Sequence, residues 1–187
     1  GGLTEGRLPL VDVYRARLKA RHKRGALEWG AAEAEFDFDA SGRIQRFTPQ
    51  GVYLDEFGSA GSGPGQFADP HAIAIDAAGN IFVADTFNHR VQKFNSVGAY
   101  LGEWGAQGTA HGAFNFPYGI AVDAKGDVYV ADTYNHRIQK FDGSGSFQRA
   151  WGSQGTNDDQ FNYPNGIAVD AGGSVYLADT NNHRIQR

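Results

Sequence analysis

The chain has 187 residues, of which 41% are hydrophobic, 13% aromatic and 20% charged, so it can form a packed core and is not expected to be disordered. The absence of Cys excludes disulfides, thiol catalysis and thiolate metal sites, and no apolar run is long enough for a membrane-spanning helix. Residues 48–187 carry eight Lys and Arg against fourteen Asp and Glu. This acidic balance argues against a face that binds nucleic-acid phosphates.

The first 32 residues differ from the rest and are treated as a separate basic segment. Residues 15–24 contain six Lys and Arg and no acid, which predicts a short basic helix or a disordered arm. A solvated linker is the preferred interpretation, with contact to nucleic acid or an anionic membrane as the alternative.

The next segment matches the first half of a calcium-binding loop. Asp37, Asp39, Ser41 and Gly42 have the spacing of such a loop, but Thr48 stands where a bidentate Glu is required. A hairpin turn explains the same residues without a metal. Calcium is therefore kept only as an alternative.

From residue 71 onwards the sequence repeats with a fixed period of 47 residues. The motif Asp-Thr-x-Asn-His-Arg begins at Asp85, Asp132 and Asp179 without gaps. Over residues 71–93 and their two later copies, twelve of 23 positions are identical in all three. Such a period indicates a fold built from one repeated supersecondary unit.

Each unit is predicted to form four short antiparallel strands. In the second complete unit these strands are expected at 118–123, 127–132, 137–141 and 146–151, where apolar residues alternate or β-branched residues cluster between turns. A 47-residue unit of four strands is typical of a β-propeller blade, so the predicted fold class is an all-β propeller.

A Gly-rich link joins each unit to the next. One Phe stays in register in all three links, and we expect it to anchor the link against the blades. A Pro three residues later, just before the first strand, loses no hydrogen bond of the sheet there. These positions are Phe67, Phe114 and Phe161, followed by Pro70, Pro117 and Pro164.

The chain resembles the NHL-repeat family of β-propellers. The resemblance rests on Asn-His-Arg at 88–90, 135–137 and 182–184, with Pro-x-x-Ile-Ala-[IV]-Asp-Ala-x-Gly upstream, and it covers about residues 43–187. It implies a propeller that is commonly six-bladed. Its members include binding domains of tripartite-motif proteins, sensor domains of bacterial receptor kinases, secreted bacterial proteins and a peptidyl-hydroxyglycine lyase. The resemblance alone favours a secreted or periplasmic location.

The propeller is placed at residues 33–187. It divides into a partial blade at 33–58, full blades at 71–105 and 118–152, and a truncated blade at 165–187. A six-bladed ring at this period needs about 282 residues. We therefore expect an open part of a larger ring, with about three to four blades here and further blades in the full-length chain.

The repeated signature is interpreted as structural, because a catalytic set is needed once and this set recurs in every complete unit. The Arg can pair with the Asp, and the His can bond a neighbouring backbone carbonyl. The signature comprises Asp85, Asn88, His89, Arg90, Asp132, Asn135, His136, Arg137, Asp179, Asn182, His183 and Arg184.

Function is expected where the repeats differ, because loops of a propeller face carry binding. Two positions stand out: the residue after the link Pro, and the residue between Thr and Asn of the signature. The candidate ligand-binding residues are His71, Tyr118, Asn165, Phe87, Tyr134 and Asn181.

The leading hypothesis is a non-catalytic module that binds a protein, peptide or glycan, with no cofactor. The first alternative is an enzyme, either a metal-dependent lyase or a related hydrolase, because the resemblance implies channel-facing histidines after such prolines. Only His71 matches that pattern, while Tyr118 and Asn165 are not usual zinc ligands. The second alternative is an RNA-binding propeller.

Overall fold

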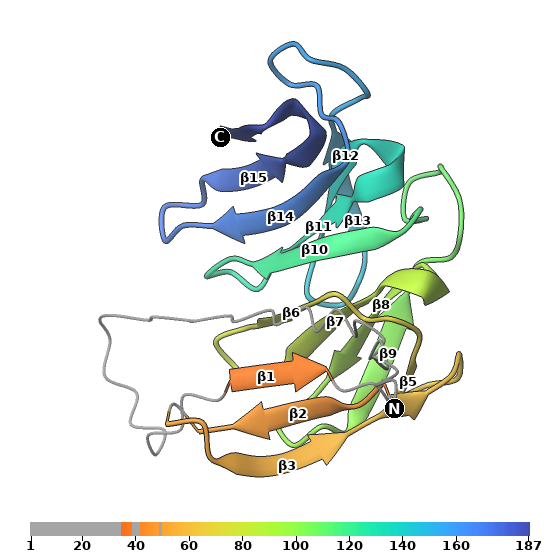
Figure 1. Ribbon diagram of the computed structural model, residues 1–187, viewed down its shortest axis with the longest axis vertical. Coiled ribbons are helices and arrows are strands. Elements are labelled where there is room, and N and C mark those ends of the chain that lie inside the picture. Colours follow the sequence, from red (N-terminus) through yellow and green to blue (C-terminus); the bar gives the residue numbers. More distant parts are fainter. Residues whose placement is uncertain (1–34, 39–41, 49) are drawn as a thin grey trace, which may run out of the picture.

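The computed structural model describes residues 35–38, 42–48 and 50–187, and these residues form an all-β structure of repeated antiparallel sheets (Figure 1). The predicted basic segment at 1–32 lies outside the described residues, as do Asp39 and Ser41 of the calcium hypothesis. Within the described ranges, no helix has the length and apolar character needed to cross a membrane.

The sheets follow one another in chain order along the long axis of the molecule (Figure 1). The first contains β1 (Glu35–Phe38), β2 (Ile44–Phe47) and β3 (Tyr53–Phe57). The second contains β6 (Ala72–Ile75), β7 (Ile81–Asp85), β8 (Arg90–Phe94) and β9 (Tyr100–Trp104).

The third sheet contains β10 (Pro117–Val122), β11 (Val128–Asp132), β12 (Arg137–Phe141) and β13 (Phe147–Trp151). The fourth contains β14 (Pro164–Val169), β15 (Val175–Asp179) and β16 (Arg184–Gln186). In each of these four sheets, strands adjacent in sequence pair antiparallel. The four-stranded antiparallel blade predicted from the repeat is therefore confirmed.

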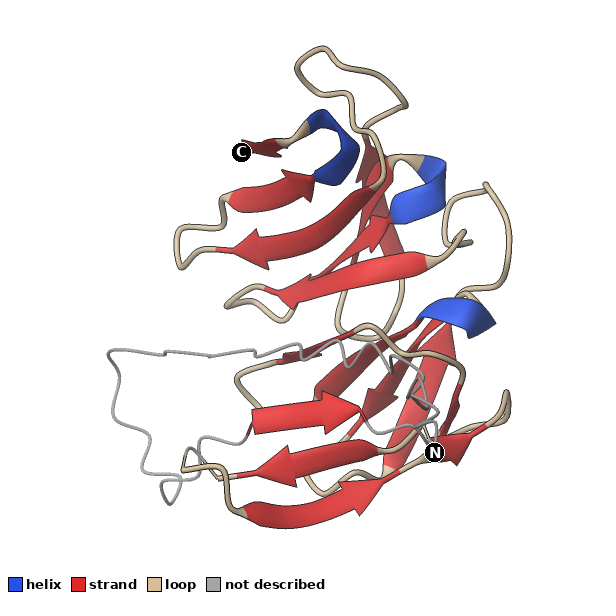
Figure 2. Cartoon of the chain, viewed as in Figure 1, coloured by secondary structure: helices blue, strands red, loops and turns tan. Residues whose placement is uncertain are grey.

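A single turn of 3₁₀ helix follows the second strand of each of the three repeat copies (Figure 2). These turns are Thr86–Asn88, Thr133–Asn135 and Thr180–Asn182. Each ends at the signature His, whose φ lies between 53° and 54° in the left-handed region. The turn reverses the chain within a few residues, so the next strand pairs directly with the previous one.

The links between the sheets also repeat. In the first link, β4 (Ser59–Ala60) pairs in parallel with β5 (Gln66–Phe67), and in the later links single bridges join Gln107 to Phe114 and Gln154 to Phe161. All three link Phe residues are buried, as expected of anchors.

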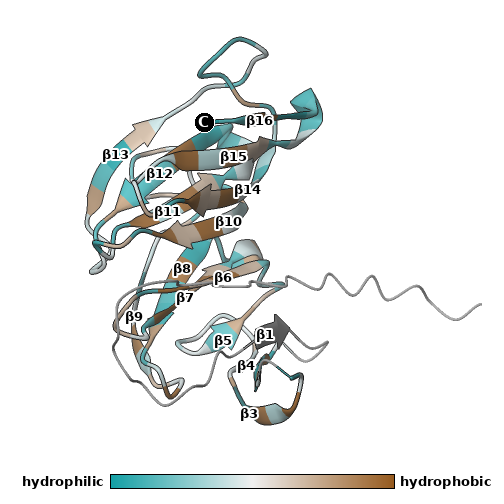
Figure 3. Cartoon of the chain, turned by 90° about the vertical axis from the view of Figure 1, so that its left-hand side faces the viewer, coloured by the Kyte–Doolittle hydropathy of each residue, from teal (hydrophilic) through white to brown (hydrophobic). Residues whose placement is uncertain are grey.

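The core lies between successive sheets rather than within any one of them. Phe82 and Val91 of the second sheet pack with Phe114 of the link and with Val130 and Phe141 of the third sheet. Hydrophobic residues accordingly concentrate on strands such as β10, β11 and β14, with hydrophilic residues in the connections (Figure 3). Burial of these side chains is the main driving force that holds one blade to the next.

The first strands of neighbouring blades approach closely, with β10 against both β6 and β14. A glycine makes this possible, because a Cβ at Gly119 would lie 2.1 Å from the Asn165 carbonyl oxygen. The last sheet differs from the others at its outer edge. Ile185 of β16 is 68% exposed, whereas the equivalent Val91 and Ile138 are buried opposite Trp104 and Trp151.

Replacement of the link anchor tests how far the core depends on it. Phe114→Ala removes a fully buried ring that lies 5.5 Å from the Phe141 ring. We expect the free energy of unfolding to fall by about 3–5 kcal/mol in a chemical denaturation experiment. The control Phe87→Ala, at a ring that is 52% exposed, should cost about 1 kcal/mol or less. Equal losses in the two variants would contradict the anchor role.

Candidate functional site

Each repeat buries one carboxylate and surrounds it with donors. Asp132 is fully buried, and its Oδ2 accepts hydrogen bonds from Asn135 (2.9 Å), Arg137 Nε (2.7 Å) and Gln139 (3.0 Å). Its Oδ1 accepts the backbone N–H of Asn115 in the link at 2.7 Å. Asp85 and Asp179 accept hydrogen bonds from equivalent groups. The Asp and Arg of the signature are therefore bonded to each other within the fold.

The charge state of this cluster follows from those bonds. Burial alone raises the pKa of Asp179, but hydrogen bonds from the Asn162 N–H, Asn182, Arg184 and Gln186 outweigh it and lower the pKa below its ordinary value. The Asp179 carboxylate is therefore ionised at neutral pH and pairs with the Arg184 guanidinium.

The Arg and Gln of the cluster also fix the link loop. Arg137 donates from its two terminal nitrogens to the carbonyl oxygens of Thr109, Ala110 and Ala113, at 2.8–2.9 Å. Gln139, also fully buried, donates to Ala113 O at 2.7 Å. A long Gly-rich loop is thereby ordered by side chains of the blade that follows it in sequence.

Two further signature residues reach into the next blade. Thr133 Oγ1 donates to the Pro164 carbonyl at 2.7 Å, and His136 Nδ1 accepts the Tyr163 N–H at 3.2 Å. The previous repeat does the same, with His89 Nδ1 accepting the Phe116 N–H at 3.1 Å. The expectation that the His bonds a backbone carbonyl is therefore wrong for these two repeats: its partner is the N–H that comes close only when two blades are assembled.

This histidine bond requires a neutral ring. Burial lowers the pKa of His89 and of His136, and the nearby Asp132 and Asp179 only partly offset that effect. Because Nδ1 is the acceptor, the proton of the neutral ring sits on Nε2. Both rings also pack edge-on against the aromatic residue whose N–H they accept, at 4.4 Å for Phe116 and 4.6 Å for Tyr163.

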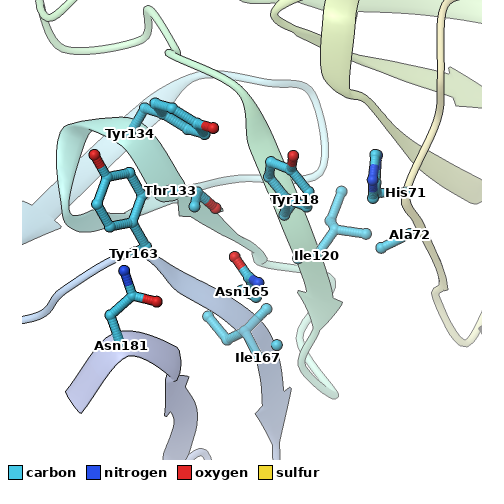
Figure 4. A pocket seen from close by; sticks show the side chains of 12 residues that line it. His71, Ala72, Tyr118, Ile120, Thr133, Tyr134, Tyr163, Asn165, Ile167 and Asn181 are labelled. Carbon is cyan, nitrogen blue, oxygen red and sulfur yellow. The ribbon is translucent and has the colours of Figure 1, made fainter. Parts of the chain in front are cut away.

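The same face of the propeller carries a pocket of about 780 Å³ (Figure 4). It lies where the starts of β6, β10 and β14 meet the 3₁₀ turns at Thr133–Asn135 and Thr180–Asn182. Five of the six candidate residues line it, namely His71, Tyr118, Tyr134, Asn165 and Asn181. They are brought together because equivalent positions of successive blades share one face.

The sixth candidate, Phe87, lies outside the pocket lining. Its ring instead packs edge-on against Phe116 at 5.1 Å. Phe116 in turn lies 4.9 Å from Tyr134, which lies 5.1 Å from Tyr163. Phe87 is therefore joined to the pocket through a row of rings.

Phe116 and Tyr163 were not among the residues that the sequence pointed to. Both directly precede the link Pro and have left-handed backbone, with φ of 49° and 51°, a conformation that is uncommon for aromatic residues. The Thr and His bonds described above hold them there. The sequence did contain a signal, because this position also differs between repeats and reads Asp69, Phe116 and Tyr163.

The pocket lining offers one imidazole and no carboxylate. Among the residues that the structure describes, no three His, Cys, Asp or Glu side chains are grouped so that they could hold a metal ion. The ring of His71 packs at 4.2 Å from Tyr118, and its Nδ1 lies 3.0 Å from Asp69 O. The arrangement suits recognition of a neutral surface by aromatic rings, hydroxyls and amides.

Comparison with solved structures shows that the chain has the fold of a β-propeller repeat protein. It superposes on a streptogramin B lyase with a TM-score of 0.61 at 17% identity, covering 81% of this chain and 46% of that one. A Bacteroides thetaiotaomicron protein of unknown function gives 0.62 at 22% identity, covering 82% and 43%. A chain of a nidogen/laminin complex gives 0.61 at 21% identity, covering 81% and 54%.

The chain thus spans about half the length of these solved chains, and likeness at such identity concerns the fold alone. A sequence model of the NHL repeat matches residues 67–94, 114–141 and 161–187. The chain therefore contains three NHL repeats, as the signature indicated. No curated protein matches this sequence.

The neutral histidines predict a pH dependence of stability. Their folded pKa values lie below the ordinary value of about 6.5, so stability is fully present above that pH and falls as the pH drops toward the folded values. We expect the melting temperature to decrease between about pH 8 and pH 5. The double variant His89→Asn/His136→Asn should show a smaller decrease, since Asn tolerates left-handed backbone and does not titrate.

The matched control for this test is His183→Asn. In the described part of the chain no backbone N–H donates to the ring of His183, although its backbone has the same left-handed conformation as His89 and His136. This variant should keep the pH dependence of the parent protein. A double variant at His89 and His136 that retained the full decrease would contradict the assignment.

Proposed function

We propose that this chain is a non-catalytic binding module that recognises a protein, peptide or glycan through the pocket on the face of the 3₁₀ turns. One observation carries the proposal: positions that differ between the repeats gather in one pocket, while the identical positions are bonded within the fold. Variation at a shared site on a rigid scaffold is the pattern of a recognition surface.

The chemistry of the lining supports binding of an uncharged ligand region. The pocket presents the rings of Tyr118, Tyr134 and Tyr163 beside the amides of Asn165 and Asn181, and it contains no Lys, Arg, Asp or Glu (Figure 4). Tyr supplies a large rigid contact area at a low entropic cost, and Asn supplies adaptable hydrogen bonds. This residue mixture is common in recognition surfaces.

The alternatives receive less support from the same residues. An enzyme of the metal-lyase kind would need several convergent ligands, whereas the pocket lining supplies His71 alone. RNA binding would need a basic face, whereas the lining has no cation. No observation in the described residues favours either one over binding of a neutral ligand.

The proposal is tested by probing the full chain on arrays of immobilised peptides and oligosaccharides. The pocket variant Tyr134→Ala/Asn181→Ala should lose about tenfold or more of the affinity for whichever probe the parent binds. Tyr134 is 45% exposed, so this change should leave the melting temperature nearly unaltered.

The control variant is Tyr53→Ala, which removes a tyrosine of similar exposure, 50%, from β3 of the first sheet. It should bind like the parent protein. If every probe bound by the parent were retained equally by the pocket variant, or if salt-sensitive binding to single-stranded RNA dominated, the proposal would fail.

A further inference from the structure

A row of four aromatic rings crosses the face beside the pocket, and we call Phe87, Phe116, Tyr134 and Tyr163 the aromatic ladder. Neighbouring ring centroids are 5.1, 4.9 and 5.1 Å apart. Rings from the 3₁₀ turns alternate with rings from the residues before the link prolines. Phe87 and Tyr134 remain about half exposed, so the ladder faces solvent instead of closing a core.

The ladder has a defined spacing, because two of its rings occupy the equivalent turn position of successive blades and the other two occupy the equivalent position before the link Pro. Phe87 and Tyr134 are equivalent, and two ring-to-ring steps of about 5 Å separate them. Equivalent rings are therefore no more than about 10 Å apart. A polyproline II helix repeats every three residues at 3.1 Å per residue, or about 9.3 Å, so one face of it can meet successive equivalent rings.

The hydrogen-bonding groups along the ladder also favour this conformation. Within the described residues, the hydroxyls of Tyr134 and Tyr163 and the side-chain amide of Asn181 have no hydrogen-bond partner. A polyproline II segment makes no internal hydrogen bonds and leaves its carbonyls free to accept. An α-helix uses its own carbonyls internally, so it would leave these donors unmatched.

The ring geometry distinguishes a peptide from a glycan. Neighbouring rings meet at 79°, 50° and 85°, so the ladder presents ring edges as well as ring faces to solvent. Pyrrolidine rings can pack against such an uneven aromatic surface, as they do where proline-rich segments dock in aromatic-lined grooves. A sugar that stacks on an aromatic residue instead needs an open ring face.

We infer that the ladder binds a proline-rich segment in the polyproline II conformation, with its pyrrolidine rings against the half-exposed Phe87 and Tyr134 rings and its carbonyls toward the Tyr and Asn donors. This inference rests on the proposed binding function and names the ligand class. The preformed conformation of such a segment lowers the entropic cost of docking on a rigid surface. Because the site is uncharged, binding should depend little on salt.

The test measures fluorescence anisotropy of a labelled oligoproline of about ten residues, long enough to cross the ladder at 3.1 Å per residue. A Gly-Ser peptide of equal length is the matched probe, since it lacks both the rings and the stiffness. We expect the oligoproline to bind the parent chain and Tyr53→Ala equally, with Kd unchanged between about 0.1 M and 1 M salt.

The ladder variant Phe87→Ala/Tyr134→Ala should raise the Kd by about tenfold or more. Tyr134→Phe, which removes only a hydroxyl, should raise it by about two- to tenfold. Absence of oligoproline binding, equal binding of the Gly-Ser peptide, or unchanged affinity in the ladder variant would overturn the inference.

The two proposals fail in different ways. A neutral oligosaccharide that binds the parent and is lost in Tyr134→Ala, without oligoproline binding, would overturn the polyproline assignment and leave the binding function standing. If no peptide or oligosaccharide depended on these residues, both would be overturned.

Discussion

A buried aspartate paired with an arginine, present in each copy of the signature, is the interaction on which the rest of this structure depends. A carboxylate removed from water is costly unless it is paired and fully hydrogen-bonded. Asp132 meets this condition with an arginine, an asparagine, a glutamine and a backbone N–H of the link. These partners come from three separate segments, so satisfying one charge joins the second strand, the third strand and the incoming loop.

The same cluster prepares the binding face. With the strand ends fixed, Thr133 and His136 reach the next blade and hold Tyr163 in an uncommon left-handed conformation beside Tyr134. The residues that are identical in all repeats thus stabilise the blades and the contacts between them. The residues that differ between repeats are held by this structure at the pocket. This division explains why the most recognisable motif in the sequence is not the site of recognition.

Much of the fold could be predicted because its causes are local. The strand predicted at 137–141 is observed there, and that predicted at 146–151 begins one residue later. The fixed period also placed five of the six candidate residues in one pocket. Phe87 was assigned to the same set by its repeat position, but it lies outside the pocket lining and its ring packs against Phe116.

What could not be predicted depends on contacts between blades. The partner of His136 is a backbone N–H 27 residues away, which becomes available only when Tyr163 adopts positive φ. Nothing in local propensity foretells that, because the residue before a proline ordinarily favours extended backbone. The aromatic ladder could not be predicted for the same reason, since two of its four rings, Phe116 and Tyr163, belong to residues that directly precede a link Pro.

The most direct test of this account is the free energy of unfolding of Asp132→Asn, measured by chemical denaturation. The change leaves Arg137 without its buried counter-charge, so we predict a loss of about 3–5 kcal/mol. Asp55→Asn removes a half-exposed carboxylate paired with Arg46 on the surface and should cost about 1 kcal/mol or less. A variant at Asp132 as stable as the parent chain would contradict the central role of the buried carboxylate.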